Sequence, residues 1–93
     1  MLSFTIRVEL HGAVEDDYDD LHEAMEKQSF VRCVKTTKGL RELPPGTYYG
    51  PSTSVDTALD EVREAVKTTG KRSSIFVAQT ETWTSSGLGE WNE

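Results

Sequence analysis

Hydrophobic and polar residues alternate without interruption along residues 4–11, which read Phe-Thr-Ile-Arg-Val-Glu-Leu-His. A repeat of two residues is typical of a β-strand that buries one face. We therefore predict a central strand here. Its buried face is expected to carry Phe4, Ile6, Val8 and Leu10. Its outer face is expected to carry Thr5, Arg7, Glu9 and His11.

Two later stretches have the three- and four-residue spacing of amphipathic helices. The first follows an acidic run at residues 15–20 and places Tyr18, Leu21 and Met25 on one side. The second has an apolar stripe made of Val55, Leu59, Val62 and Val66. Ser54 or Thr53 is the expected N-cap of this second helix, because both side chains can accept a backbone hydrogen bond there.

Three further strands are predicted at residues 30–37, 47–50 and 74–80. Pro44 and Pro45 lack backbone N–H donors, so we expect an irregular connection between the first two of these strands. The order β-α-β-β-α-β indicates a ferredoxin-like α+β sandwich, with two helices on one face of a four-stranded antiparallel sheet. Residues 1–83 would form this domain, and residues 84–93 a flexible or loosely docked tail.

The expected hydrophobic core combines the inner faces of these strands and helices. It consists of Phe4, Ile6, Val8, Leu10, Leu21, Met25, Phe30, Leu59, Val62, Val66, Ile75 and Val77.

The length and charge of the chain limit the kinds of protein that it can be. The chain has 93 residues, enough for one domain, and its 16 acidic and 10 basic residues give a formal charge of −6. The chain as a whole therefore has no long-range attraction for nucleic acid, and RNA binding would need a local basic patch. An acidic surface equally suits the basic groove of a protein partner. No apolar run approaches the ~20 residues of a membrane helix, so no membrane association is expected.

The only cysteine is Cys33, so an internal disulfide and a Cys/His metal site are both excluded. A single thiol fits the reducing cytoplasm, where we expect the protein to act. The acidic run at residues 15–20 suits the first turn of a helix, because the helix dipole favours negative charge there. Carboxylates also bind Mg²⁺, but acids on one helix point in different directions. No metal site is predicted, and Mg²⁺ remains the candidate cofactor.

The outer row of the first strand is the main candidate for chemistry. Arg7, Glu9 and His11 alternate on one face, with neighbours roughly 7 Å apart. In RNA cleavage Arg7 would stabilise charge on the phosphate, and His11 or Glu9 would transfer the proton. The same row also suits a solvated face with a cross-strand ion pair.

Other residues suit RNA binding. The candidates are Arg32, Tyr48, Tyr49, Lys71 and Arg72, with Lys35, Lys38 and Arg41 as further members of a basic rim. Tyr48, Tyr49 and Phe76 can stack on bases from an open sheet face, and they can equally form a homodimer contact. His22, on the first helix, is interpreted as a packing or surface histidine.

Several segments resemble the GhoS-type endoribonuclease antitoxins, over roughly residues 3–88. The segments are FTIRVELHGA, DYDDLHEAMEKQSFVR, LPPGTYYG, EVREAVKTTGK and TETWTSSGL. The most specific parts are Arg7 and His11 in the first strand, the helix face with His22, and Phe30 with Arg32.

The resemblance implies a ferredoxin-like fold, akin to the small metal-dependent nuclease of CRISPR adaptation. It also implies cleavage of single-stranded RNA, directed against the transcript of a membrane-lytic toxin peptide. The alternative is a non-catalytic acidic module that binds a protein, such as a phage-encoded inhibitor of a nucleic-acid-binding defence complex. Net charge favours the alternative, and the sequence resemblance favours the antitoxin.

Overall fold

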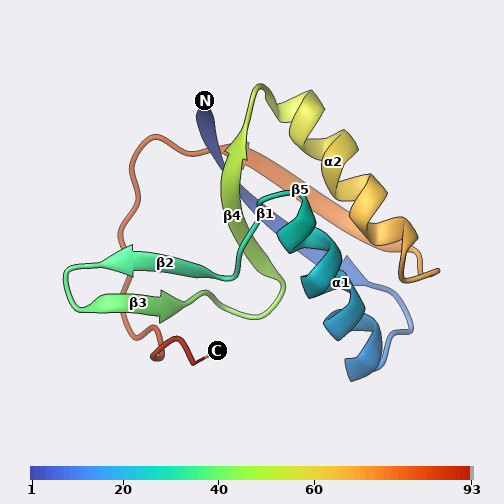
Figure 1. Cartoon of the computed structure of the whole chain (residues 1–93), viewed down its shortest axis with the longest axis horizontal. Coiled ribbons are helices and arrows are strands. Elements are labelled where there is room, and N and C mark those ends of the chain that lie inside the picture. Colours follow the sequence, from blue (N-terminus) through green and yellow to red (C-terminus); the bar gives the residue numbers. More distant parts are fainter. Residues whose placement is uncertain (93) are drawn as a thin grey trace.

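The protein is a mixed α+β fold in which two helices pack on an antiparallel sheet (Figure 1). The computed structural model describes residues 1–92. Its elements are β1 (Leu2–Leu10), α1 (Glu15–Lys27), β2 (Cys33–Thr36), β3 (Gly39–Glu42), β4 (Thr47–Ser52), α2 (Val55–Lys67) and β5 (Ser73–Gln79). No helix in this described part of the chain is long and apolar enough to cross a membrane.

Strand β1 is the centre of the larger sheet, as its alternating sequence predicts. It pairs antiparallel with β4 on one side and with β5 on the other. All four apolar residues of its inner face, from Phe4 to Leu10, are buried, whereas Arg7 and Glu9 are exposed. The prediction of which residues of this strand face the core and which face solvent is therefore confirmed.

Helices α1 and α2 lie beside each other and cover the inner face of β1 (Figure 1). Leu21 and Met25 of α1 are buried there, as predicted. Ser54 caps α2, because its Oγ accepts a hydrogen bond from the Thr57 backbone nitrogen at 3.0 Å. The buried core consists of Phe4, Ile6, Val8, Leu10, Leu21, Met25, Phe30, Tyr48, Ala58, Val62, Ala65 and Val66, with Ile75 and Val77 packed against it.

The prediction for the buried face of α2 was wrong in one respect. Val55 is 44% exposed and Leu59 is only half-buried, outside the core cluster. Ala58 and Ala65 are buried instead, alongside Val62 and Val66. The face of α2 that packs on the core is therefore the one with Ala58, Val62, Ala65 and Val66.

The predicted four-stranded sheet is present only in part, because five strands are divided between two sheets. Residues 30–37 were expected to form one strand beside β4. Only Val31 pairs there, through two backbone hydrogen bonds with Tyr49 of 2.9 and 2.8 Å. The chain then leaves the sheet, and β2 pairs with β3 in a separate hairpin. A two-residue turn, Thr37 and Lys38, closes this hairpin at a small loop-closure cost, and it is followed by Gly39 with φ +105°.

The C-terminal segment lies along β3 (Figure 1). The Glu42 nitrogen donates to the Gly89 carbonyl at 2.9 Å, and the Trp91 nitrogen donates to the Leu40 carbonyl at 3.3 Å. Within the predicted tail, Gly89 and Trp91 therefore have backbone partners on the hairpin, and the last residue, Glu93, lies outside the described residues.

Candidate functional site

The predicted catalytic row is exposed at the outer side of β1, and its members have different neighbours. Arg7 lies between Thr47 of β4 and Phe76 of β5, and Glu9 is opposite Ser74. His11 follows the end of β1, and its Nε2 lies 2.9 Å from the Ser74 hydroxyl.

A groove at the edge of β1 contains two members of this row. The groove has a volume of about 370 Å³ and lies between β1, α1 and the loop that carries Pro44 and Pro45. We call it the arginine–histidine groove, and its charged and titratable lining residues are Arg7, Glu9, Tyr18, His22, Arg32 and Glu42. The structure therefore groups Arg7 and Glu9 with His22, whereas His11 does not line this groove.

His22 is held in the groove by a buried tyrosine. Its Nδ1 is 2.7 Å from the hydroxyl oxygen of Tyr48, a residue with no exposed surface. Burial lowers the pKa of His22, and the positive charge of Arg32 lowers it further, against the smaller opposing effects of Asp19 and Glu42. The imidazole is consequently neutral at neutral pH. In the tautomer whose Nδ1–H donates to Tyr48, Nε2 is a proton acceptor.

Burial raises the pKa of Tyr48, so its hydroxyl keeps its proton throughout the physiological range. Tyr48 was predicted to bind RNA. Because its ring is buried in the core, it is not available for stacking on a base, and its contribution to the groove is the contact with His22. Tyr49 is half-buried, with its ring edge-to-face on Trp83 at 6.3 Å between centroids.

Arg32 is fixed at the groove from two directions. Its guanidinium lies 3.9 Å from a carboxylate oxygen of Glu42 and 5.1 Å from the centre of the Trp91 ring. These contacts come from β3 and from the C-terminal segment, so the position of Arg32 depends on both. A guanidinium in this place can bind phosphate oxygens.

Two other predicted RNA-binding residues, Lys71 and Arg72, lie near His11, just beyond the C-terminal end of β1. Lys71 forms an ion pair with Asp17 at 3.8 Å. The side chain of Arg72 is exposed, and its carbonyl accepts a hydrogen bond from the His11 nitrogen at 2.8 Å. Neither residue lines the arginine–histidine groove.

Within residues 1–92, no three histidine, cysteine, aspartate or glutamate side chains converge to hold a metal ion. In the acidic run, Asp17 instead accepts a hydrogen bond from the Val14 backbone nitrogen at 3.0 Å and so caps α1.

Sequence reasoning did not single out Glu42, and it interpreted His22 as a packing or surface histidine, which agrees with the half-buried contact of His22 with Tyr48. His22 stands four residues after Tyr18, which places both on one flank of α1. Nothing in the sequence indicates that the hairpin brings Glu42 to Arg32. Chemically, the groove combines a neutral imidazole for proton transfer with the Arg32 guanidinium for phosphate charge, and Arg7 also lines it.

Comparisons with protein-family models, with curated protein sequences and with solved structures give no significant match to this chain.

Proposed function

We propose that this protein binds single-stranded RNA in the arginine–histidine groove and cleaves it there, as a GhoS-like endoribonuclease antitoxin of the cytoplasm. The observation that carries the proposal is the neutral, tyrosine-held His22 in one groove with Arg7 and Arg32. Cations and a proton acceptor that line one groove are what phosphodiester cleavage requires.

The proposed reaction is attack by the ribose 2′-hydroxyl on the adjacent phosphorus. His22 takes the 2′-hydroxyl proton, and the arginines stabilise the additional negative charge on the phosphate. A bond forms between the 2′-oxygen and phosphorus while the bond to the 5′-oxygen breaks. The 5′-oxygen takes a proton from solvent, which leaves a 2′,3′-cyclic phosphate and a 5′-hydroxyl end.

The finer fold assignment is part of the same proposal. We interpret the domain as a variant of the ferredoxin-like fold in which the fourth sheet strand is reduced to Val31. The sheet order β5-β1-β4 and the Val31–Tyr49 pair support this interpretation.

The test is cleavage of an unstructured, end-labelled RNA by wild-type protein and by two histidine variants, each verified as folded by circular dichroism. We expect His22→Gln to lower kcat/KM by roughly 10²-fold or more, because it removes the general base. His11→Gln is the matched control and should retain activity. If His11→Gln loses activity and His22→Gln retains it, the catalytic residues are instead the outer row of Arg7, Glu9 and His11. Reactions with Mg²⁺ and with a chelator test whether a cation contributes.

The non-catalytic alternative is supported by the exposed acidic side chains of α1. Glu15, Asp16, Asp19, Asp20, Glu23 and Glu26 are all exposed. Such a surface suits the basic face of a protein partner. If the wild-type protein neither cleaves nor binds RNA, this alternative is favoured over the endoribonuclease.

A further inference from the structure

The outer edge of β5 has no neighbouring strand within the described part of the chain. In the sheet order β4-β1-β5, strand β5 pairs only with β1. The Thr80 nitrogen donates to the Ser3 carbonyl, and the His11 nitrogen donates to the Arg72 carbonyl, both at 2.8 Å. Since the backbone groups of an antiparallel strand point alternately to its two sides, the even-numbered residues of β5 bond to β1. The residues whose N–H and C=O groups point to the outer edge are therefore Ser73, Ile75, Val77 and Gln79.

The outer edge of β5 lacks the features that keep a strand edge single. Edge strands usually carry charged residues, proline or a covering segment that prevents pairing with another chain. From Ser73 to Thr80 the sequence has no charged residue and no proline. The opposite edge of the sheet has two such features, because Val31 bonds to Tyr49 of β4 and Pro51 has no N–H to donate. The sheet is therefore protected at β4 and unprotected at β5.

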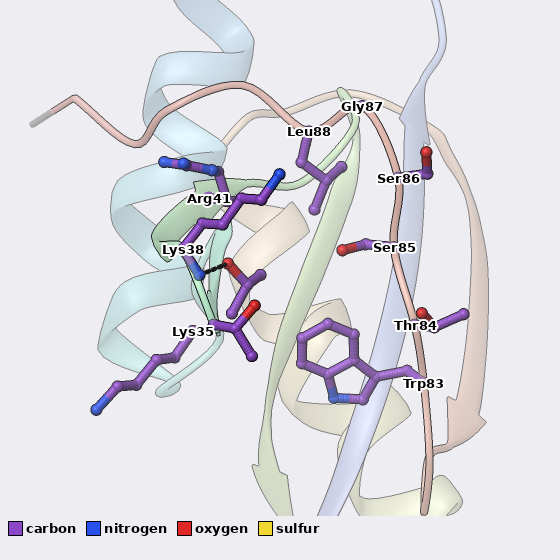
Figure 2. Close-up of a pocket in the computed structure, with 11 residues that line it drawn as sticks. Lys35, Lys38, Arg41, Trp83, Thr84, Ser85, Ser86, Gly87 and Leu88 are labelled. Carbon is purple, nitrogen blue, oxygen red and sulfur yellow. Dashed lines mark hydrogen bonds between the residues drawn. The ribbon is translucent and has the colours of Figure 1, made fainter.

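The chain that follows β5 turns away from this edge. The Trp83 ring lies edge-to-face on Tyr49, which belongs to β4 on the far side of β1. Figure 2 shows this ring directed toward the β2–β3 hairpin. The Gly89 carbonyl then accepts a hydrogen bond from Glu42 of β3. Residues 83–92 consequently run along the hairpin and not along the outer edge of β5.

Apolar side chains remain uncovered on both sides of the edge. On the outer face of the sheet, Phe76 of β5 is 67% exposed. On the helix side, Val55 of α2 is 44% exposed and Leu59 is half-buried. Glu64 and Thr68 line a hollow shared with α1, and Val55 and Leu59 each stand nine residues before one of them, about two and a half helical turns. Val55 and Leu59 therefore lie on the flank of α2 away from α1, where α2 packs on β5.

We propose that two copies of this chain pair through the outer edges of β5, antiparallel and around a two-fold axis at Phe76. Side chains keep to their own face of the sheet only in registers whose paired residue numbers add to an even sum. Among these, the register centred on Phe76 pairs the whole of β5 with itself. Ser73 then faces the partner's Gln79, and Ile75 faces the partner's Val77, so the outward N–H and C=O groups of the two copies bond to each other.

This arrangement covers the apolar side chains that one copy leaves exposed. Phe76 packs against the partner's Phe76 on the outer face, as a directly opposed aromatic pair. On the other face, the two α2 flanks that carry Val55 and Leu59 come to lie on either side of the axis. Because the β4 edge is protected, the assembly ends at two copies. No residue that lines the arginine–histidine groove belongs to β5 or α2, so the pairing does not use the groove.

The two ends of β5 are complementary in charge. Lys71 and Arg72 precede the strand, and Glu81 follows it. In the antiparallel pair the basic end of each copy lies beside the acidic end of the other, whereas a parallel pair would bring like charges together. Lys71 also lies 3.8 Å from Asp17 of its own chain, while Arg72 and Glu81 are exposed. Charge therefore favours the antiparallel orientation, in spite of the net charge of −6 on each copy.

The first test is sedimentation of the wild type and two lysine variants over a wide range of concentration. We expect the wild type to approach the mass of two chains as concentration rises. Phe76→Lys should weaken the association by at least about tenfold, because it places two ammonium groups opposite each other at the axis. Leu40→Lys is the matched control. It changes an exposed apolar strand residue of the hairpin, makes the same change in net charge and should leave the association unaltered.

The second test locates the register by oxidative cross-linking of cysteine variants in a Cys33→Ala background. Phe76→Cys should form a disulfide between copies, because opposed residues at a non-hydrogen-bonded position have Cα atoms about 4.5 Å apart. Ser74→Cys alone should not, since its two copies would lie roughly 13 Å apart along the strands. A mixture of Ser74→Cys and Ala78→Cys chains should cross-link, because these two positions face each other in the proposed register.

Three results would overturn the proposal. The first is a wild type that stays monomeric at the highest concentration, and the second is equal weakening by Leu40→Lys and Phe76→Lys. The third is a cross-linking yield in Ser74→Cys as high as in Phe76→Cys, which would exclude a two-fold axis at residue 76. His22→Gln separates this proposal from the one for the groove, since it should lose cleavage and still form the dimer.

Discussion

His22 shows how one contact can give an ordinary residue a chemical role. A histidine on the flank of a helix is common, and its sequence neighbours do not distinguish it. Here the buried Tyr48 hydroxyl orients the ring, while burial and Arg32 favour the neutral form. Proton transfer near neutral pH needs a base that is not already protonated. His22 meets that condition because of its surroundings.

The lowered pKa of His22 predicts a pH dependence of stability. The unfolded chain binds the histidine proton with the ordinary pKa of 6.5, whereas the folded state binds it only at lower pH. Between these two values the unfolded state binds more protons, so the free energy of unfolding falls as pH decreases below 6.5. Urea denaturation at a series of pH values should show this fall in the wild type.

In His22→Gln the fall in the free energy of unfolding should be smaller over the same pH range. His11→Gln is the control for replacing a histidine elsewhere. An identical pH profile in His22→Gln and wild type would contradict the assigned environment of His22.

At the scale of elements, the arrangement of the strands depends on the point where the chain that leaves α1 crosses β4. Phe30 is fully buried, and Val31 pairs with Tyr49. Gly50 of β4 lies directly against this crossing. A Cβ atom there would clash with the Ser29 carbonyl oxygen and lie 2.8 Å from Phe30 Cδ1. The absence of a side chain at Gly50 therefore lets the two segments pack.

Gly50→Ala should destabilise the protein by at least about 2 kcal/mol, because the backbone at Ser29 has to move. Gly89→Ala is the matched control. A Cβ at that position would have no neighbour within 4 Å, so its effect should stay within about 0.5 kcal/mol. Thermal and urea unfolding of both variants measure the difference. If the two variants have equal free energies of unfolding, the backbone at Ser29 can make room for a Cβ at position 50, which would contradict the close packing at this crossing.

On the scale of the whole molecule, stability is unevenly distributed. The main core cluster draws on β1, β4, α1 and α2, whereas the hairpin contributes only Val34 of β2 to the buried hydrophobic residues of the described chain, and Val34 lies outside that cluster. The hairpin depends instead on the C-terminal segment, through the Glu42–Gly89 and Trp91–Leu40 backbone bonds and the Arg32–Trp91 contact. Local opening of the hairpin should therefore require less free energy than global unfolding.

Trp91→Ala should loosen the hairpin selectively. Loss of the cation–π contact, worth about 1 kcal/mol, should speed amide hydrogen exchange in β2 and β3 by about fivefold and leave β1 unchanged. Phe76→Ala removes another aromatic ring, 67% exposed on β5, and serves as the control that leaves hairpin exchange unaltered. Uniform acceleration across all strands in Trp91→Ala would mean that the hairpin and the core unfold together.

The sequence alone determined the elements whose pattern is local. The alternation in β1, the helical spacing of Leu21 and Met25, and the Ser54 cap all concern near neighbours in the chain, where backbone geometry sets which side chains share a face. The outward direction of Arg7 and Glu9 followed from the same rule.

Which distant residues come into contact depends on the tertiary fold. Residues 30–37 have the composition of a sheet strand, but the tight turn that precedes Gly39 lets residues 33–42 pair locally. Gly50 leaves room for the chain to cross β4. That departure brings Glu42 to Arg32 and places the hairpin beside the C-terminal segment. Spacing along the chain cannot predict such groupings, because they depend on where a segment leaves the sheet. The arginine–histidine groove could therefore not be assembled from the sequence alone.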